Sequence, residues 1–499
     1  MPHSNYAEPS GASGHAAPED GATETIAAIA TPPGAGGIGI VRLSGTNAFA
    51  VGRAIFRARH AQDTPDGYPP SHALTYGHVV DPATGEAVDE VLAAFMRAPH
   101  TYTREDVVEI DAHGGPLLLN RILALALASG ARAARPGEMT MRAFLNGRLD
   151  LAQAEAVMAL IQAESDAGLR LAMRQLSGDL SRRIEAIRAA AMEAMVRIDA
   201  AIDFPEEEVP QPDRAEIASL IERARASVGE LLAGAARGRL LREGMRVVIL
   251  GRPNVGKSSL LNALLGTERA IVTPIPGTTR DTVEATGSVR GIALHLVDTA
   301  GLTETADPVE RIGVERSHAA ASSADLALFV VDGSTPLSDA DDDAIAGLRA
   351  ITPDGPASDV AASSDMAARP VMLVINKSDL PPAYDDDAAR ALWPGAPIVR
   401  TSALSPDGVA PLEDAIADLV LAGRAHAADP LVASVRHHDA LSRASAALES
   451  ADTALASGIP LEYVAFDLKT ALDALGEITG ETATGDLLDR IFAEFCIGK

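Results

Sequence analysis

The stretch 245–265 constrains the fold more than any other part of the chain. Apolar residues at 247–250 precede the loop G-R-P-N-V-G-K-S at 251–258, and leucines at helical spacing follow it. This order predicts a strand, a glycine-rich loop and a helix, rather than a plain turn. Backbone N–H groups of such a loop can surround a phosphate chain, Lys257 can reach the β- and γ-phosphates, and the Ser258 hydroxyl can bind Mg²⁺. The sequence therefore predicts a nucleotide-binding P-loop.

Length and composition point to a multidomain globular protein. The chain has 499 residues, and 47% of them are hydrophobic, which suffices for several cores. No apolar run approaches the roughly 18 residues that a membrane helix needs. The first 24 residues lack the basic start and apolar centre of a signal peptide. We therefore expect a disordered tail at 1–24, a cytoplasmic protein and no membrane association.

Cysteine content and charge exclude further classes. The single cysteine, Cys496, allows no intrachain disulfide and no cysteine-rich metal site, which fits a reducing compartment. The formal net charge of −27 argues against a broad nucleic-acid-binding face. Any contact with RNA must therefore be local or supplied by a partner.

The N-terminal region has a mixed pattern of strands and helices. Strand-like runs at 25–31 and 38–43 flank a Pro/Gly segment whose glycines match G-x-G-x-x-G. We reject a dinucleotide site there, because two prolines precede the glycines, a strand follows them, and no acidic residue stands about 20 positions on. Further strand-like runs at 91–96 and 107–111 and a helix-like run at 117–127 indicate an α+β domain.

Helical periodicity begins near Leu149 and continues toward Phe204. Another helix follows from Asp213, a residue suited to an N-cap. Helical periodicity returns at 424–495, so we predict a helical bundle into which the nucleotide domain is inserted. The predicted segments are a tail at 1–24, an N-terminal α+β domain at 25–146, a first helical segment at 147–240, a nucleotide domain at 241–423 and a second helical segment at 424–499; within the nucleotide domain, 352–369 is expected to be a flexible loop.

Four further motifs follow the P-loop in the order of a Ras-like guanine-nucleotide switch. Gly277-Thr278-Thr279 offers a hydroxyl for Mg²⁺, and Asp298-Thr299-Ala300-Gly301 offers a carboxylate for the metal water and an N–H for the γ-phosphate. Asn376-Lys377-Ser378-Asp379 suits guanine, because one carboxylate can accept from both N1–H and the 2-amino group. Thr401-Ser402-Ala403-Leu404 adds backbone contacts to the base. Each motif alone is weak, but five in order predict GTP binding.

The water-positioning residue is not obvious. Leu302 stands where a Ras-like switch carries glutamine. Asn254, with backbone carbonyls of 273–278, could hold a monovalent cation that neutralises charge on the phosphates, or it could merely cap a turn. Glu310 could orient water, although from the residues alone a solvated helix carboxylate is the favoured interpretation.

Six motifs together resemble the tRNA-modification GTPase MnmE (TrmE) family, over about residues 24–499. They are the stretches 251–254, 277–281, 298–302, 309–313 and 135–138 and the terminal Phe-Cys-Ile-Gly-Lys at 495–499. The resemblance implies a homodimer with an N-terminal tetrahydrofolate-binding and dimerisation domain, a helical domain and a K⁺-dependent G domain. It also implies a heterotetramer with an FAD-containing partner of the MnmG/GidA type, which adds an aminomethyl or carboxymethylaminomethyl group to the 5-position of wobble uridine in tRNA.

The resemblance assigns roles to particular residues. The tetrahydrofolate derivative would contact Arg42, Glu109, Arg148 and Lys499; Mg²⁺ would meet Ser258 and Thr279, and K⁺ would meet Asn254, Thr273, Ile275 and Thr278. The catalytic candidates are Glu310, which becomes the water-orienting residue, Lys257, and Cys496, whose alternative is a buried inert thiol. The GTP-binding candidates are Asn254, Val255, Gly256, Lys257, Ser258, Ser259, Thr273, Pro274, Ile275, Pro276, Gly277, Thr278, Thr279, Asp298, Thr299, Ala300, Gly301, Asn376, Lys377, Ser378, Asp379, Ser402, Ala403 and Leu404.

The folate assignment has a chemical basis of its own. A pterin ring presents a donor edge like that of guanine, which suits a carboxylate such as Glu109, and cations suit the glutamate tail. Without the resemblance, the four folate candidates would be interpreted as surface charges. Arg148 stands where the family often has lysine, and Thr303 where arginine is common, so no role is assigned to Thr303.

One alternative function shares every nucleotide motif. A ribosome-assembly GTPase switch would bind ribosomal RNA without modifying it. Such switches usually add a basic RNA-binding module, whereas this chain is acidic and ends in a helical segment with Cys496.

Overall fold

The computed structural model describes residues 24–60, 67–203, 213–267, 284–298, 324–351, 370–421 and 430–499. The predicted tail, apart from its last residue, and the predicted loop at 352–369 lie outside these ranges. The chain forms two compact units, one containing Met1–Met158 with Thr479–Lys499 and the other containing Ala159–Ile478. This division is coarser than the five segments predicted from the sequence, whose boundaries stay a prediction. In the described ranges of the chain, no helix has the length and apolar character needed to cross a membrane.

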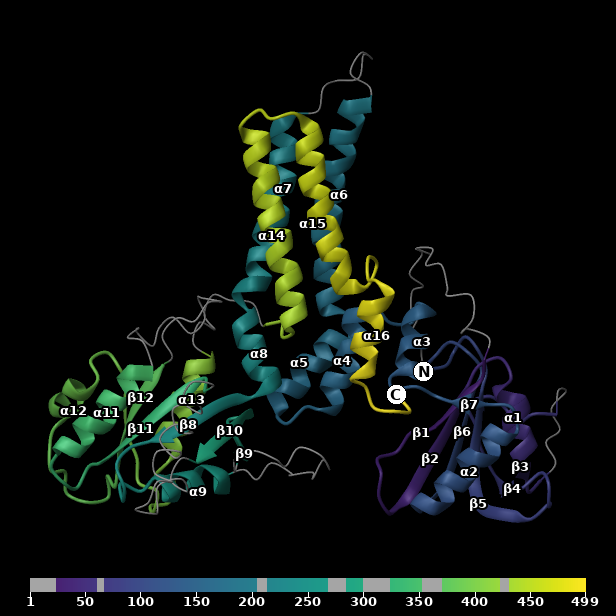
Figure 1. Ribbon diagram of the computed structural model, residues 1–499, viewed down its shortest axis with the longest axis horizontal. Helices are drawn as coiled ribbons and strands as arrows, with labels where there is room; N and C mark the ends of the chain where they lie inside the picture. The colour runs from purple at the N-terminus through teal and green to yellow at the C-terminus, as the bar shows by residue number, and fades with distance from the viewer. Residues whose placement is uncertain are drawn as a thin grey trace, which may run out of the picture. The chain divides into compact units, whose positions relative to one another are not determined.

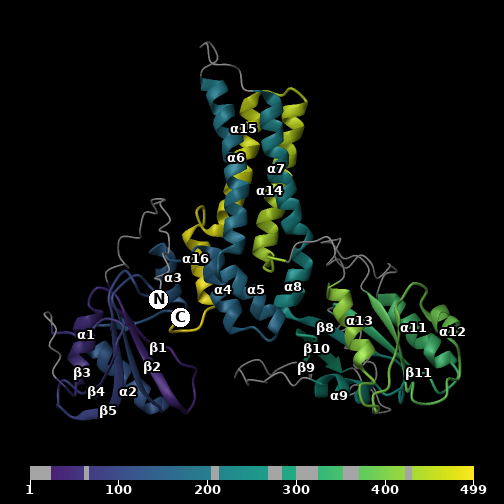
Figure 2. The same cartoon turned by 180° about the vertical axis from the view of Figure 1, so that it is seen from behind.

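A seven-stranded sheet forms the centre of the first unit (Figure 2). Its elements along the chain are β1 Ile26–Ile29, β2 Gly36–Ser44, α1 Ala48–Ile55, β3 Phe56–Ala58, β4 Leu74–Val80, β5 Ala87–Met96, β6 Val107–Gly114, α2 Pro116–Ala128, β7 Arg132–Ala133 and α3 Glu138–Leu145. The strand order is β3-β4-β5-β6-β2-β1-β7, with antiparallel pairs except for the parallel pair β1 and β7. The α+β prediction is therefore confirmed.

One face of this sheet is covered by the helices α1 and α2. Val41, Leu43, Val108 and Ile110 lie in the core that these helices close. Because successive side chains of a strand point to opposite faces, Arg42 of β2 and Glu109 of β6 lie on the other face, directly opposite each other in register.

The C-terminal segment belongs to the same unit. Helix α16, Gly485–Ala493, packs with the segment that follows it against α3 and the first turns of α4, Leu151–Ile161. Gly137 has φ 64°, and a Cβ there would lie 2.6 Å from the Phe492 carbonyl oxygen. Only glycine allows this close approach between the start of α3 and the end of the chain.

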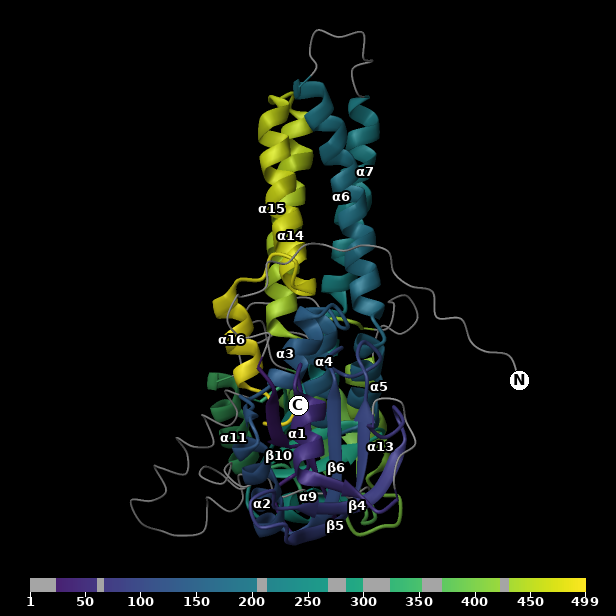
Figure 3. The same ribbon diagram turned by 90° about the vertical axis from the view of Figure 1, so that its right-hand side faces the viewer.

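Long helices form one region of the second unit. They are α5 Asp166–Leu176, α6 Asp179–Asp203, α7 Arg214–Ala233, α8 Ala235–Glu243, α14 Val435–Ala456 and α15 Leu461–Thr479. Helix α7 packs against both α6 and α14, which come from opposite sides of the inserted domain in the sequence (Figures 1 and 3). The Asp213 side chain accepts from the Ala215 N–H, as predicted for an N-cap. The predicted bundle with an inserted domain is confirmed.

The inserted domain is a doubly wound α/β fold. Its elements are β8 Met245–Leu250, α9 Lys257–Thr267, β9 Glu284–Val289, β10 Ile292–Asp298, β11 Leu326–Asp332, α11 Asp339–Ile351, β12 Val371–Asn376, α12 Asp386–Leu392, β13 Ile398–Arg400 and α13 Ala410–Leu421. The sheet order is β13-β12-β11-β8-β10-β9, parallel apart from β9. Strands β11 and β12 are buried along their whole length, as expected between two layers of helices. In such folds ligands bind at the carboxyl ends of the strands.

Candidate functional site

The phosphate loop connects β8 to α9, and its backbone requires glycine at both ends. Gly251 has φ 140°, and a Cβ there would lie 2.3 Å from the Val330 carbonyl oxygen. Gly256 has φ 98°, and a Cβ there would lie 2.3 Å from Asn376 Nδ2. Asn254 also has a left-handed backbone, with φ 67°. Close contacts with β11 and β12 therefore restrict both ends of the loop to glycine.

Lys257 folds back over this loop. Its Nζ donates to the carbonyl oxygens of Gly251 and Arg252, both at 2.9 Å. The ammonium group is thus held at the loop backbone, where it can meet the oxygens of a phosphate chain. Ser258 follows it at the start of α9, an eleven-residue helix whose first N–H groups favour an anion.

The loop after β12 is tied to the phosphate loop. Asn376 Nδ2 donates to the Val255 carbonyl oxygen at 2.9 Å, and Lys377 Nζ donates to the Asn254 carbonyl oxygen at 3.1 Å. Lys377 also forms an ion pair of 2.6 Å with Asp332 at the end of β11. Burial raises the pKa of Asp332, but hydrogen bonds from Lys377 and Ser334 outweigh it and hold that pKa below its ordinary value. Two predicted motifs are therefore connected directly by hydrogen bonds.

The predicted base-recognition residues also lie together. Asp379 Oδ1 accepts from Ser402 Oγ at 2.6 Å, and Asn376 Oδ1 accepts from the Ala403 N–H at 3.4 Å. Leu404 is 86% exposed, so an apolar side chain is available at the rim of this loop. A carboxylate held by one hydroxyl can accept two further donors, as guanine offers and adenine does not.

Several predicted GTP and metal residues lie outside the described residues. They are Thr273, Pro274, Ile275, Pro276, Gly277, Thr278, Thr279, Thr299, Ala300, Gly301 and Glu310. Asp298 ends β10 in register with Ile249 of β8, beside the phosphate loop. Of the predicted Mg²⁺ residues Ser258 is described, and Asn254 is the described member of the predicted K⁺ set, so both metal sites stay predictions.

The predicted folate residues gather on the face of the N-terminal sheet opposite α1 and α2, next to the core that this face forms with Met139 of α3. Arg42 Nε donates to Glu109 Oε1 at 2.6 Å, and Arg42 Nη1 donates to the Gly498 carbonyl oxygen at 3.3 Å. Gly498 has φ 91° and packs against the Ile29 backbone, so the end of the chain lies beside β1 and β2. Lys499 directly follows, which brings three of the four candidates to one place.

The fourth candidate, Arg148, lies across Tyr102. Its guanidinium is 4.7 Å from the ring centroid, and its Nη1 donates to the Tyr102 carbonyl oxygen at 3.0 Å. Burial raises the pKa of the Tyr102 hydroxyl, while a hydrogen bond with Thr140 and the charges of Arg148 and Arg42 act against it. Both arginines therefore act on the same phenol, and the set fits an anionic ligand with an aromatic ring.

Comparisons with known proteins agree over almost the whole chain. The family model "MnmE helical domain" matches residues 151–496, and "GTP-binding protein TrmE N-terminus" matches residues 25–148. The tRNA modification GTPase MnmE of Geobacillus kaustophilus is 45% identical over 95% of this chain and 99% of its own length. The chain belongs to the tRNA modification GTPase MnmE family.

A second relative gives the same result. MnmE of Chloroflexus aurantiacus is 50% identical over 95% of this chain and 100% of its own length. The G domain of the T. maritima FeoB iron transporter is a more distant match among solved structures, 25% identical over 35% of this chain and 98% of that chain, with a TM-score of 0.25. Because these relatives, which cover 95% of the chain, are tRNA modification GTPases by name, the modification function is favoured over ribosome assembly.

Sequence reasoning missed one residue of the folate candidate site. Asp111 lies two positions after Glu109 on β6, on the same face of the sheet. Burial and the neighbouring Glu109 charge raise its pKa, and Arg42 acts against them. Its Oδ1 is covered and has no hydrogen-bond partner within the described ranges. The strand alternation around Glu109 was the signal that could have found it.

Cys496 is exposed, so the alternative of a buried inert thiol is wrong. The Cys496 carbonyl oxygen accepts from the Gly137 N–H at 3.4 Å and from the Lys499 N–H at 3.3 Å. These contacts hold the terminal tetrapeptide against the start of α3 in the MnmE N-terminal unit. The role of the thiol in the modification stays a prediction.

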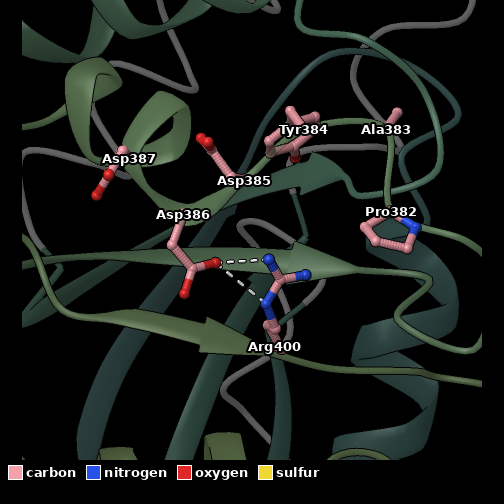
Figure 4. Close-up of a pocket in the computed structure, with 7 residues that line it drawn as sticks. All are labelled: Pro382, Ala383, Tyr384, Asp385, Asp386, Asp387 and Arg400. Carbon is pink, nitrogen blue, oxygen red and sulfur yellow. Dashed lines mark hydrogen bonds and ion pairs between the residues drawn. The ribbon is translucent and has the colours of Figure 1, made fainter.

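A separate hollow lies beside the nucleotide site, with a volume of about 600 Å³ (Figure 4). It is lined by Pro382, Ala383, Tyr384, Asp385, Asp386, Asp387 and Arg400. Arg400 Nη2 pairs with Asp386 at 2.5 Å across it. The hollow contains none of the predicted GTP residues, although Arg400 directly precedes the 401–404 motif, so we assign it no ligand.

Proposed function

We propose that this protein is a K⁺-dependent GTP hydrolase that drives the modification of wobble uridine in tRNA. It acts with an FAD-containing partner of the MnmG/GidA type and a tetrahydrofolate one-carbon donor, and the product carries an aminomethyl or carboxymethylaminomethyl group at the 5-position. The carrying observation is the direct connection of the phosphate loop to the guanine loop by Asn376 and Lys377. These two contacts support a single site for phosphate and base.

In this proposal each nucleotide residue has one task. Lys257 binds the β- and γ-phosphates, Ser258 and Thr279 bind Mg²⁺, and Asp379 accepts the donors of guanine. Bound K⁺, held by Asn254, Thr273, Ile275 and Thr278, supplies positive charge at the phosphates. Glu310 orients the water that attacks the γ-phosphorus, and the products are GDP and phosphate.

The folate site is proposed on the face of the N-terminal sheet opposite α1 and α2, beside the end of the chain. The residues proposed to bind the folate are Arg42, Glu109, Arg148 and Lys499. Glu109 is already paired with Arg42, so the pair is close to neutral and presents both a donor and an acceptor to a pterin ring. Arg148 and Lys499 suit the carboxylates of the glutamate tail. Cys496, exposed two residues from Gly498, is proposed to act in the modification.

The proposed assembly follows from the same family resemblance. The N-terminal domains form a homodimer, which joins the partner in a heterotetramer in the cytoplasm. The net charge of −27 supports a division of labour in which the partner supplies most of the contact with tRNA. The five domain segments predicted from the sequence belong to this proposal.

Mass spectrometry of wobble uridine tests the proposed function. A strain that lacks this protein should lose the 5-substituent, and the wild-type protein should restore it. Lys257→Ala should fail to restore it, because the phosphate-binding ammonium is lost. Normal wobble uridine in the deletion strain, with a defect in ribosome assembly instead, would favour the rRNA switch.

The cation requirement is tested by the rate of GTP hydrolysis in K⁺ and in Na⁺. The larger cation should give the faster rate, because a cage of one amide oxygen and several carbonyls suits it better. Asn254→Ala should remove the difference between the two salts. Equal rates for the wild-type protein in both salts would contradict the K⁺ site.

A further inference from the structure

The second residue of the phosphate loop is held by a contact that the family motifs do not predict. Arg252 Nε donates to Asp341 Oδ1 at 3.0 Å, and Arg252 Nη2 donates to Thr335 Oγ1 at 2.7 Å. Asp341 is 1% exposed and lies in the first turn of α11. An ion pair between a loop arginine and a fully buried carboxylate has a fixed geometry, since breaking it would leave that charge buried and unpaired.

The two oxygens of Asp341 have different partners. Oδ2 accepts from the Ser338 N–H at 3.0 Å and from Ser338 Oγ at 2.8 Å. This oxygen acts in the manner of a capping box, in which the third residue of a helix reaches back to its N-cap. Oδ1 is not needed for the cap and instead holds Arg252. The helix cap therefore uses only Oδ2, and Oδ1 is left to bind Arg252.

Arg252 in turn holds Lys257. The Arg252 carbonyl oxygen accepts from Lys257 Nζ at 2.9 Å, so the residue fixed by Asp341 through its side chain positions the phosphate-binding ammonium through its backbone. Asn376 and Lys377 fix the next stretch of the loop, at Val255 and Asn254. The loop is thus anchored from more than one element, and Asp341 supplies the anchor that comes from α11.

We propose that Asp341 is a positioning residue of the nucleotide site. Acting through Arg252, it holds the phosphate loop in the shape that receives nucleotide, and it makes no contact with the nucleotide itself. The inference rests on the proposed GTPase function. Its consequence is specific: the α11 anchor contributes to the binding of GDP and GTP alike and does little for the chemical step.

The alternative is that Asp341 only caps α11. In that case its replacement would lower the free energy of unfolding, and nucleotide affinity would fall only because the folded protein is less stable. The chain offers a way to separate the two roles, because Ser338 contributes to the cap and not to the loop. Asp342, exposed in the same turn, controls for the loss of one negative charge.

The test uses the full-length protein with fluorescent GDP and GTP analogues, measured by equilibrium titration, and single-turnover hydrolysis at saturating GTP. The variants are Asp341→Asn, Arg252→Gln and the double variant, with Ser338→Ala and Asp342→Asn as controls. We expect each single variant to weaken both nucleotides by about tenfold, and the double variant to lose less than about twofold more, because both changes break one contact. Hydrolysis at saturation should stay within about twofold of wild type.

Other results would overturn the inference. Affinity within about twofold of wild type for both Asp341→Asn and Arg252→Gln would show that the anchor is not used. Multiplied losses in the double variant would show that the two residues act independently. If Ser338→Ala weakened nucleotide affinity as much as Asp341→Asn does, Asp341 would act only as a helix cap. If the wild-type protein bound neither nucleotide, the proposed function would fail, and the inference with it.

Discussion

The carboxylate of Asp379 is the group on which base specificity is expected to depend. Its Oδ1 is oriented by the Ser402 hydroxyl, and the adjoining loop offers the Ala403 N–H and the exposed Leu404. The carboxylate can therefore accept the two donors of guanine at a fixed position. Because the acceptor is charged, replacing one of its oxygens with a donor should lower nucleotide affinity strongly.

Replacing Asp379 with Asn should reverse the base preference. The amide puts a donor opposite a guanine donor, so GTP affinity should fall by about 1.5–3 kcal/mol for each charged hydrogen bond lost. Xanthine presents an acceptor there, so xanthosine triphosphate should bind better to the variant than to the wild type. Titration with both nucleotides measures this. Ser402→Ala, which removes only the orienting hydroxyl, should weaken GTP less; unchanged GTP affinity in Asp379→Asn would exclude the assignment.

Glu310 is expected to act in hydrolysis rather than in binding. Leu302 has no hydrogen-bonding group, so the attacking water needs another acceptor. Glu310→Ala should therefore lower kcat by about 10²-fold or more while GTP affinity persists through Lys257 and Ser258. Single-turnover hydrolysis in K⁺ and nucleotide titration separate the two effects. Hydrolysis within about twofold of wild type would contradict a catalytic role for Glu310 and favour the interpretation as a solvated helix carboxylate.

There is a physical reason why the sequence predicted some of these site residues and not others. The phosphate loop was predictable because the geometry of a phosphate chain dictates glycine, lysine and a hydroxyl at fixed local spacing. The Arg42–Glu109 pair depends on the register of two strands that are 67 positions apart, which no local pattern encodes. Asp341 was missed for the same reason, since its partner Arg252 lies 89 positions away. Asp111, by contrast, could have been found from the alternation of β6 around Glu109.

At the scale of the elements, a buried charge network holds α3 to the N-terminal sheet. Glu138 is 2% exposed and accepts from Arg132 Nη2 at 2.6 Å, from the Arg135 N–H at 2.8 Å and from Arg142 Nη2 at 3.2 Å. Burial raises the pKa of Glu138, but hydrogen bonds from Arg132 and Arg135 and the charges of Arg132 and Arg142 outweigh it and lower the pKa to about 2. The carboxylate is therefore ionised in the folded domain far below its ordinary range.

This network should give the N-terminal unit a defined acid sensitivity. The pKa of Glu138 is lower in the folded state than its ordinary 4.5, so its stabilisation is fully present above about pH 4.5 and is lost as the pH falls toward about 2. Glu138→Gln should cost about 3–5 kcal/mol at neutral pH, since it removes the buried charge that pairs with Arg132 and with the buried Arg142. The difference from wild type should shrink across that window.

Denaturant unfolding at several pH values between about 2 and 7 measures the effect. Glu86→Gln, at an exposed position of the same unit, is the control and should leave the free energy of unfolding unchanged within about 0.5 kcal/mol. If wild type and Glu138→Gln lost stability in parallel as the pH fell, the network would not be the source of the acid sensitivity.

The helices show how far periodicity carries a prediction. A continuous apolar stripe from Leu151 to Leu180 predicted long helices, and the structure has three, α4, α5 and α6. The interruption before α5 comes from Ser165, whose side chain caps the helix by accepting from the Gly168 N–H. Part of the stripe is exposed, since Ile161, Leu169 and Met173 are 47%, 43% and 46% exposed while α5 buries Leu171 and Gln175. The pattern therefore locates the helices better than their ends or their buried faces.

At the scale of the whole molecule, the end of the chain returns to its beginning. Phe492 and Phe495 of the C-terminal segment pack with Phe144 and Leu151 in a cluster of the N-terminal unit. The Gly498 carbonyl oxygen accepts from Arg42, one of the proposed folate ligands. Helical periodicity could not predict this return, because α16 has the same apolar spacing as a bundle helix. What decides its place is the shape of the aromatic cluster that receives it.

Phe492→Ala should therefore weaken the folate site without affecting the nucleotide site. Phe492 is 2% exposed, with its ring centroid 6.5 Å from that of Phe144 and 5.3 Å from that of Phe495. Its truncation should cost about 3–5 kcal/mol of stability in the N-terminal unit, from lost burial and the cavity left behind. Tetrahydrofolate affinity should fall, because the chain end no longer holds its place beside Arg42.

Nucleotide affinity should persist in this variant, because the phosphate loop and the base loop lie in the other compact unit. Denaturant unfolding, folate titration and nucleotide titration on one preparation distinguish the effects. Phe466→Ala on α15, 70% exposed, removes the same side chain and should change none of the three measurements. Equal loss of folate and GTP binding in Phe492→Ala would contradict the expected independence of the two sites, since it would show that the C-terminal segment stabilises both units together.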